Sequence, residues 1–334
     1  MSHIAVVGTG TWATALAQVL IDNSHSVILI GRDKKQIDDI NINHQNLAYF
    51  PKEILLDSRI KATDNYEEGL KDASHILLAV PTKAIREVLN EISKYIRNKK
   101  YFINASKGFD TLSNKRISEV IREIIDEKYR YPIVSLIGPS HAEEVIVRQL
   151  TTVTSVSLDI DSAKNVQELF SNDYFRVYTV IDEVGAEYGV AIKNAIAIAS
   201  GVLSGLGYGD NARAALVTRG LAEMVKFGTY FGGEMKTYLG LTGLGDLMVT
   251  CNSKHSRNFM AGYQIGCADG ASDFLKNNDK TVEGIRTTKV IYEMSKEASI
   301  EMPIIEAIYR VLYEDSKPSE LIKQLMLRPL KSEL

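Results

Sequence analysis

The chain has 334 residues, of which 45% are hydrophobic, and its 39 basic and 42 acidic side chains give a formal net charge of −3. This length allows more than one buried core, so we expect two domains, and the nearly balanced charge argues against a surface for nucleic acid or anionic membrane. With only two cysteines, no targeting signal and no apolar run long enough to span a bilayer, the sequence predicts a cytoplasmic protein with no metal site and no stable membrane insertion.

The chain begins with an apolar strand, His3–Val7, that runs through a glycine-rich turn into a helix. Gly8 permits the tight turn, Gly10 lets the backbone approach a pyrophosphate, and Ala13 lets the helix pack against the strand. The first N–H groups of that helix would then face the phosphate oxygens. This stretch predicts a dinucleotide-binding site, and an ordinary glycine-rich turn is the alternative.

A second strand, Ser26–Ile30, ends at Gly31, Arg32 and Asp33. An acidic residue at this place usually binds the ribose 2′-hydroxyl of NAD, whereas an arginine can pair with the 2′-phosphate of NADP. Arg32 therefore favours NADP as the preferred cofactor, and the neighbouring Asp33 leaves NAD as a second one. The alternative is that Arg32 is a solvated loop residue without a ligand.

Strand and helix patterns alternate through the first half of the chain. Further strands are predicted at His75–Val80, Tyr101–Ala105, Ile133–Ile137, Thr152–Ser157 and Arg176–Val180, and helices at Lys83–Tyr95, Ser113–Glu127 and Ser162–Ser171. Such alternation is typical of a doubly wound, Rossmann-like, mostly parallel sheet with helices on both faces. From about residue 182 the pattern changes to long helices broken by glycines. We expect an α/β dinucleotide-binding domain over residues 1–182 and an all-helical substrate-binding domain over residues 183–334.

Polar loops follow several of these strands. In an open α/β sheet, ligands bind outside the carboxyl ends of the strands, so the loops that carry Lys107 and Ser140 should open onto one crevice. Lys107 lies between Ser106 and Gly108 at a strand end, which distinguishes it from an ordinary solvated loop lysine. We expect Lys107 and Ser140 to meet the cofactor and the substrate.

Lys193 lies inside the first long helix of the second half, among alanine, valine and isoleucine residues. Helical geometry places it on or beside a buried face, where an unpaired lysine is costly. Desolvation or a nearby cation would lower its pKa toward that of a useful base. The alternative is a structural lysine whose stem covers apolar surface while its ammonium group reaches solvent.

Glycines at 240, 243 and 245 let the backbone turn closely around a small ligand just before Asp246. Farther on, Ser256, Arg257 and Asn258 open a helical pattern with hydroxyl, guanidinium and amide donors together. Charge and directed donors at a helix N-terminus suit a phosphate, and a helix cap with exposed polar residues is the alternative. Because a phosphate would repel Asp246, we expect this carboxylate to bind a substrate hydroxyl or to fix a lysine.

Seven short blocks follow one another along the chain: Gly8–Ala17, Ser106–Gly108, Gly138–Glu144, Lys193–Ala195, Gly243–Leu247, Ser256–Asn258 and Val282–Gly284. In this order they resemble the NAD(P)-dependent sn-glycerol-3-phosphate dehydrogenases of bacterial type, and the resemblance spans nearly the whole chain. Two positions depart from the family pattern. Ala13 stands where glycine is common, and Thr281 stands where a second valine is common.

The resemblance implies a reversible reduction of dihydroxyacetone phosphate to sn-glycerol 3-phosphate with NADP or NAD, which supplies glycerophospholipid synthesis. It makes Lys193 the catalytic residue that exchanges a proton with the C2 oxygen. The substrate contacts that it implies are Lys107, Gly138, Ser140, Lys193, Asp246, Ser256, Arg257 and Asn258. The cofactor contacts, with the two turn glycines included, are Gly8, Gly10, Thr11, Trp12, Arg32, Lys107, Ala142, Arg257, Val282 and Glu283.

Two other functions stay open at this point. A dehydrogenase of another small hydroxy acid could place a substrate carboxylate at Arg257, and a non-catalytic dinucleotide sensor would leave Lys193 without a role. His141 and His255 adjoin the ligand loops, and imidazole titrates near neutrality, but the family pattern gives the proton to lysine, so we expect both to be supporting residues. The expected partner is a small phosphorylated substrate, and the sequence leaves the oligomeric state open, with a homodimer as the candidate.

Overall fold

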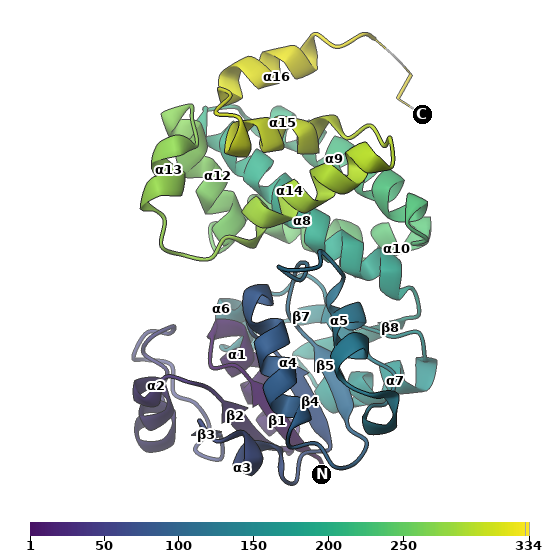
Figure 1. The fold of residues 1–334 in the computed structure, drawn as a ribbon. Helices are drawn as coiled ribbons and strands as arrows, with labels where there is room; N and C mark the ends of the chain where they lie inside the picture. Colours follow the sequence, from purple (N-terminus) through teal and green to yellow (C-terminus); the bar gives the residue numbers. More distant parts are fainter. Residues whose placement is uncertain (331, 334) are drawn as a thin grey trace.

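The computed structural model describes residues 1–330 and 332–333. Figure 1 shows two parts stacked on each other, with the strands and their helices below and helices alone above. The chain passes upward where strand β8 (Phe175–Val180) gives way to helix α8 (Glu183–Gly205). In the described part of the chain, no helix is long and apolar enough to cross a membrane.

The lower part, within the described residues, is built on an eight-stranded sheet in the order β3-β2-β1-β4-β5-β6-β7-β8. Its strands are β1 (His3–Val7), β2 (Ser26–Ile30), β3 (Lys61–Thr63), β4 (His75–Leu78), β5 (Tyr101–Asn104), β6 (Val134–Ile137), β7 (Thr151–Val156) and β8. All neighbouring strands pair in parallel except β6 and β7. The prediction of a doubly wound, mostly parallel sheet is therefore confirmed.

Two features of the sheet were not predicted. Strand β3 has only three residues, too few for an alternating pattern to stand out. Strand β7 runs antiparallel to β6, because the segment between them carries only the four-residue helix α6 (Ala142–Val145) instead of a long crossover helix.

Alternate residues of β1 pack into different cores. Ile4 and Val6 join the core beneath α1 (Thr11–Asp22) and α7 (Ile160–Phe170), whereas Ala5 joins the core beneath α4 (Ile85–Ser93) and α5 (Ile117–Ile124) on the opposite face. Helices α4 and α5 begin later than predicted, at Ile85 and Ile117. The helical segments of this part are α1 (Thr11–Asp22), α2 (Lys34–Asp38), η1 (Asp39–Asn43), α3 (Tyr66–Leu70), η2 (Thr82–Ala84), α4 (Ile85–Ser93), α5 (Ile117–Ile124), η3 (Glu127–Tyr129), α6 and α7 (Ile160–Phe170).

Helix α8 forms the centre of the upper part, and nearly all of its 23 residues are buried. A Cβ atom on Gly201 of α8 would collide with the backbone of α12 (Arg257–Ala268) at Phe259, so these two helices cross with their backbones in contact. The other helical segments here are α9 (Asp210–Tyr230), α10 (Met235–Tyr238), η4 (Leu241–Gly245), α11 (Asp246–Asn252), α12 (Arg257–Ala268), α13 (Ser272–Asn277), α14 (Glu283–Glu297), α15 (Pro303–Tyr313) and α16 (Pro318–Met326).

Asp182 fixes the start of α8. Its buried carboxylate accepts hydrogen bonds from the N–H of Gly185 at 2.8 Å, the N–H of Glu234 at 2.8 Å and the hydroxyl of Thr237 at 2.6 Å. The first of these caps the helix, and the other two tie it to the segment around α10. The position of α8 is thus set before its functional residues begin.

Candidate active site

The glycine turn after β1 leaves the N-terminus of α1 open. Gly8 has φ +124°, and a Cβ there would lie 2.6 Å from the carbonyl oxygen of Ala79, so only glycine fits. Gly10 precedes Thr11, the first residue of α1, and no side chain caps this helix. Among the described residues, no further atom lies within 4 Å of the place a Gly10 Cβ would take. The unpaired N–H groups and this space fit a dinucleotide pyrophosphate.

Lys107 and Ser140 meet beside Trp12. Lys107 Nζ donates to Ser140 Oγ at 3.4 Å and lies 5.7 Å from the centre of the Trp12 ring. Ser140 Oγ donates in turn to the carbonyl oxygen of Gly138 at 3.0 Å. The indole Nε1 of Trp12 is buried, and residues 1–330 and 332–333 contain no hydrogen-bond partner for it. A buried donor without a partner is available to a ligand.

Arg32 extends into solvent at the end of β2. Its side chain is 77% exposed, and its Nη1 lies 3.3 Å from Oε1 of Glu87 on α4. Asp33 caps α2, and its carboxylate accepts hydrogen bonds from the N–H groups of Lys35 and Gln36. Because capping already occupies the Asp33 carboxylate, Arg32 is the better placed of the two for the ribose end of a dinucleotide.

Lys193 of α8 and Asp246 of α11 form a buried ion pair, with their side chains 3% and 1% exposed. Lys193 Nζ also donates to Thr250 Oγ1 at 3.0 Å, so the alternative of a lysine that reaches solvent is wrong. Burial and the positive charge of Lys107 lower the pKa of Lys193 to about 8, against the opposing charge of Asp246. Asp246 Oδ2 is buried and has no hydrogen-bond partner among the described residues. Lys193 can therefore exchange a proton near neutral pH, and Asp246 Oδ2 can accept a hydrogen bond from a hydroxyl.

His141 and His255 face each other, with their ring centres 5.7 Å apart. His141 precedes α6 and Ala142, the first, buried residue of that helix. Burial and the charge of Lys107 lower the pKa of His141 below its usual value, which favours the neutral ring. A neutral imidazole beside two lysines suits a supporting residue better than a proton donor.

The predicted anion cluster lies at the start of α12. Ser256 caps the helix by accepting a hydrogen bond from the N–H of Phe259, and the side chain of Arg257 is exposed. Asn258 Nδ2 donates to Oδ1 of Asn194, the neighbour of Lys193, at 2.9 Å. The start of α12 is thereby joined to the helix turn that carries Lys193.

Glu283 is the first residue of α14 and reaches the sheet part of the molecule, whereas Val282 is the N-cap residue of this helix and packs against the core of the helical part. Thr82, in the turn after β4, donates through its hydroxyl to Glu283 Oε2 at 2.9 Å. Burial raises the pKa of the Glu283 carboxyl, while the charge of Arg257 opposes the shift. The helical part thus closes over the strand ends near the glycine turn.

Three residues that contact the site were not assigned from the sequence: Thr82, Asn194 and Thr250. Thr250 follows Asp246 by four residues on one helix, a spacing that could have indicated it. Asn194 belongs to the Lys193–Ala195 block and Thr82 to a loop after a predicted strand, but both contact residues far away in sequence, and these contacts leave no local signal. In the ranges that the structure describes, no three His, Cys, Asp or Glu side chains are grouped to hold a metal ion.

Comparisons with known proteins agree on one family. The family models described as NAD-dependent glycerol-3-phosphate dehydrogenase N-terminus and C-terminus match residues 3–163 and 182–323. A relative from Enterococcus faecalis named glycerol-3-phosphate dehydrogenase [NAD(P)+] is 48% identical, with 99% of this chain and 97% of the relative covered. The chain belongs to the NAD-dependent glycerol-3-phosphate dehydrogenase family.

Two further members of the glycerol-3-phosphate dehydrogenase family match over all or nearly all of their length. The relative from Staphylococcus haemolyticus with the same name is 47% identical over all of both chains. The crystal structure of glycerol-3-phosphate dehydrogenase from Coxiella burnetii is 32% identical with a TM-score of 0.90, and the match covers 98% of this chain and 99% of that one. The sheet and the helical part of this chain therefore recur together in the glycerol-3-phosphate dehydrogenase family.

Proposed function

We propose that this chain reversibly reduces dihydroxyacetone phosphate to sn-glycerol 3-phosphate, the backbone of glycerophospholipids, and that Lys193 carries the proton. Family membership supports the reaction. The observation that carries the residue assignment is the buried pair of Lys193 and Asp246, joined through Asn194 and Asn258 to the start of α12.

Ketone reduction needs a proton at the oxygen that becomes the hydroxyl. Negative charge develops on that oxygen as the carbonyl is reduced, so a cationic Lys193 both stabilises the charge and donates the proton. Lys193 must regain a proton before the next turnover. In the reverse direction neutral Lys193 accepts the C2 hydroxyl proton, and its pKa of about 8 keeps both forms accessible near neutrality.

The substrate phosphate would bind at the start of α12. Ser256 and Asn258 supply a hydroxyl and an amide there, and the exposed guanidinium of Arg257 supplies charge with two directed donors. Lys107 and Ser140 lie across from them on the strand-end loops and would hold the rest of the substrate. Asp246 Oδ2 would accept a hydrogen bond from a substrate hydroxyl.

The cofactor would lie along the sheet edge that starts at the glycine turn. When bound, a reduced nicotinamide supplies the hydride to C2. Gly8, Gly10 and the N-terminus of α1 would hold the pyrophosphate, and Arg32 would bind the 2′-phosphate, which makes NADPH the preferred cofactor and NADH the second. Thr11, Trp12, Lys107, Ala142, Arg257, Val282 and Glu283 would complete the contacts.

The sheet part and the helical part of the molecule would bind different ligands. We propose that residues 1–182 bind the dinucleotide and that residues 183–334 supply most of the substrate site. Cys251 and Cys267 are both free thiols, which supports a reducing cytoplasm as the place of action. A homodimer is the assembly we propose, and light scattering of the purified protein measures it directly.

A substrate panel tests the proposed reaction. NADPH oxidation is followed with dihydroxyacetone phosphate, with unphosphorylated dihydroxyacetone and with a set of 2-keto acids. Because the first two differ only in the phosphate, we expect rapid oxidation with dihydroxyacetone phosphate and a loss of kcat/KM by about 10² or more without it. Faster turnover of a 2-keto acid would favour a hydroxy-acid dehydrogenase, and NADPH binding without any turnover would favour a nucleotide sensor.

A further inference from the structure

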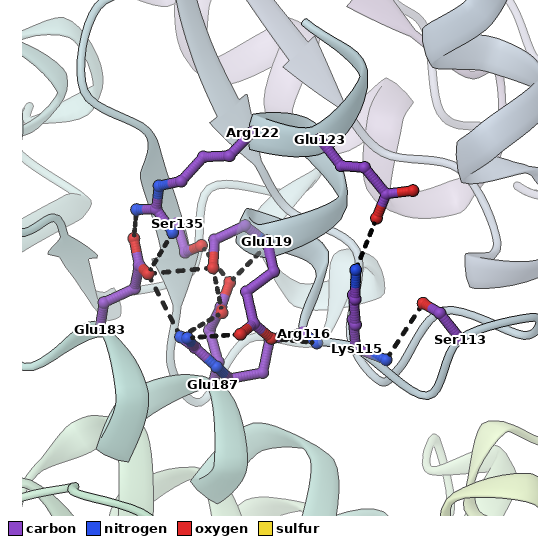
Figure 2. A network of polar contacts seen from close by, with 10 residues as sticks. Ser113, Lys115, Arg116, Glu119, Arg122, Glu123, Ser135, Glu183 and Glu187 are labelled. Atoms are coloured by element: carbon purple, nitrogen blue, oxygen red, sulfur yellow. Dashed lines mark hydrogen bonds and ion pairs between the residues drawn. The ribbon is translucent and has the colours of Figure 1, made fainter.

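A buried polar network joins α8 to the sheet part (Figure 2). Glu183 and Glu187 lie one turn apart on α8 and are 2% and 5% exposed. Arg122 of α5 binds Glu183, with its Nη1 2.8 Å from Oε1, and Arg116 at the start of α5 lies 3.2 Å from both carboxylates. Two buried carboxylates on one helix are thus paired with arginines from the other part of the molecule, while burial and the charge of Glu183 still raise the pKa of Glu187 to about 7.

Two serines donate to the Glu187 carboxylate from different elements. Ser118 of α5 donates through its hydroxyl to Oε2 at 2.6 Å, and Ser135 of β6 donates through its hydroxyl to Oε1 at 2.9 Å. Both serines are fully buried, at 0% and 1% exposure. They differ in their other contacts: the Ser118 hydroxyl also lies 3.0 Å from Oε1 of Glu183 on the same helix α8, whereas the Ser135 hydroxyl also contacts Asn104 of the sheet.

From Ser135, hydrogen bonds continue through the sheet to the turn that carries Lys107. Asn104, at the end of β5, is the cross-strand neighbour of Ser135 and donates through its Nδ2 to Ser135 Oγ at 3.4 Å. Asn104 Oδ1 accepts a hydrogen bond from the N–H of Ser106 at 3.0 Å. Ser106 directly precedes Lys107. Ser135 therefore lies on a continuous path from the helix of Lys193 to the turn of Lys107.

We propose that Ser135 is a positioning residue for the reaction, which links Glu187 on the helix of Lys193 to the Asn104–Ser106 turn and so fixes the distance between Lys193 and Lys107. The proposal rests on the proposed function, in which Lys193 exchanges the proton. Neither serine touches the reacting groups, so Ser135 acts through the placement of both lysines.

The distance between the two lysines has a measurable consequence. The groups whose charges act on Lys193 are Asp246 and Cys251 from α11, Lys107 from the loop after β5 and His141 from the loop after β6. Among the first three, Lys107 lowers the pKa of Lys193, and a Coulomb effect weakens as two charges separate. If the path through Ser135 is broken, Lys107 is less firmly held and the pKa of Lys193 rises.

The test compares Ser135→Ala with Ser118→Ala. Each variant removes one buried hydroxyl that donates to Glu187, but only Ser135→Ala interrupts the path to Lys107. The measured quantity is kcat/KM for sn-glycerol 3-phosphate oxidation against pH, which reports groups of the free enzyme. For Ser135→Ala we expect the midpoint of the rising limb to move up by about 0.5 pH unit and kcat to fall about 3- to 10-fold. For Ser118→Ala we expect the midpoint of the wild-type enzyme.

An unchanged midpoint in Ser135→Ala, or an equal shift in both variants, would overturn the proposal, because a general loosening of α8 does not distinguish the two serines. If Ser135→Ala does not fold, Ser135→Cys keeps a side chain of similar size with a weaker donor and should shift the limb in the same direction. Absence of dihydroxyacetone phosphate reduction by the wild-type enzyme would refute the proposed function itself. An active wild-type enzyme with no shift in Ser135→Ala refutes this inference alone.

Discussion

Arg32 is the residue on which the proposed cofactor choice depends. Among the described residues it forms an ion pair with Glu87, which is 71% exposed, and an ion pair between such exposed groups contributes little to stability. The guanidinium can therefore leave Glu87 for a 2′-phosphate at small cost. The proposed preference for NADPH would then depend on a side chain that the end of β2 presents to solvent.

Arg32→Ala should weaken NADPH binding by about 1.5–3 kcal/mol, the range for a hydrogen bond to a charged group, and NADH binding by much less. Dissociation constants follow from quenching of the fluorescence of Trp12, the single tryptophan of the chain, in the proposed cofactor site. Glu87→Gln, which keeps the arginine, is the matched control and should not lose NADPH affinity. An equal loss of NADPH and NADH in Arg32→Ala would mean that Arg32 does not bind the 2′-phosphate.

The sequence indicated single site residues unevenly. Gly8 and Gly10 could be recognised because the turn needs glycine for steric reasons that the chain itself displays. Lys193 could be singled out by its apolar helix, and Asp246 was expected to bind a hydroxyl or to fix a lysine, but the sequence did not say that the lysine is Lys193, 53 positions away. The family resemblance supplied roles for both. Thr82 lies in a polar loop after a predicted strand, but its contact with Glu283 appeared only in the fold.

At the scale of elements, a buried carboxylate ties two helices together. Glu223 of α9 accepts hydrogen bonds from the N–H groups of Ile304 at 2.8 Å and Ile305 at 3.3 Å, at the start of α15. Burial raises the pKa of the Glu223 carboxyl to about 7. The carboxyl therefore stays protonated in the folded chain at pH values where the unfolded chain has already released the proton.

This difference predicts a pH-dependent stability. The folded-state pKa of Glu223 lies above the unfolded value, so its contribution is fully present below the unfolded pKa and is lost as the pH rises through about 7. Between the unfolded and the folded pKa of Glu223, each pH unit lowers the free energy of unfolding by about 1.4 kcal/mol, up to about 3 kcal/mol in all. Between acidic and alkaline pH, the free energy of unfolding measured with urea should fall less for Glu223→Gln than for wild type. Glu297→Gln, at an exposed glutamate of α14, is the control, and an equal loss in Glu223→Gln and wild type would refute the assignment.

The elements themselves were mostly predictable. Long apolar runs bounded by glycine and polar turns located seven of the strands, because alternation and burial leave a pattern in four or more residues. The three-residue strand β3 leaves no such pattern. The direction of β7 depends on how the chain returns after α6, which no periodicity records.

At the scale of the whole molecule, the site is assembled from two parts that meet through α8. Lys193 comes from the helical part, and Lys107 comes from a strand end of the sheet part. The network of Glu183 and Glu187 in Figure 2 locks the two parts together one to three turns before Lys193. The change from alternating strands to long helices was visible in the sequence. The buried polar network was not, because charged residues such as Glu183 and Glu187 are normally expected at the surface.

The measurement that tests the account most directly is the pH dependence of sn-glycerol 3-phosphate oxidation in wild type and Lys193→Met. Methionine keeps the length of the side chain and removes its charge, and Lys289→Met, at an exposed lysine of α14, is the matched control. Wild type should gain kcat/KM as the pH rises through about 8, because neutral Lys193 accepts the proton. Lys193→Met should bind NADPH as wild type does. Its kcat/KM should no longer rise with pH, and its kcat should be lower by about 10² or more. A folded Lys193→Met protein that binds NADPH and turns over near the wild-type rate would contradict the account.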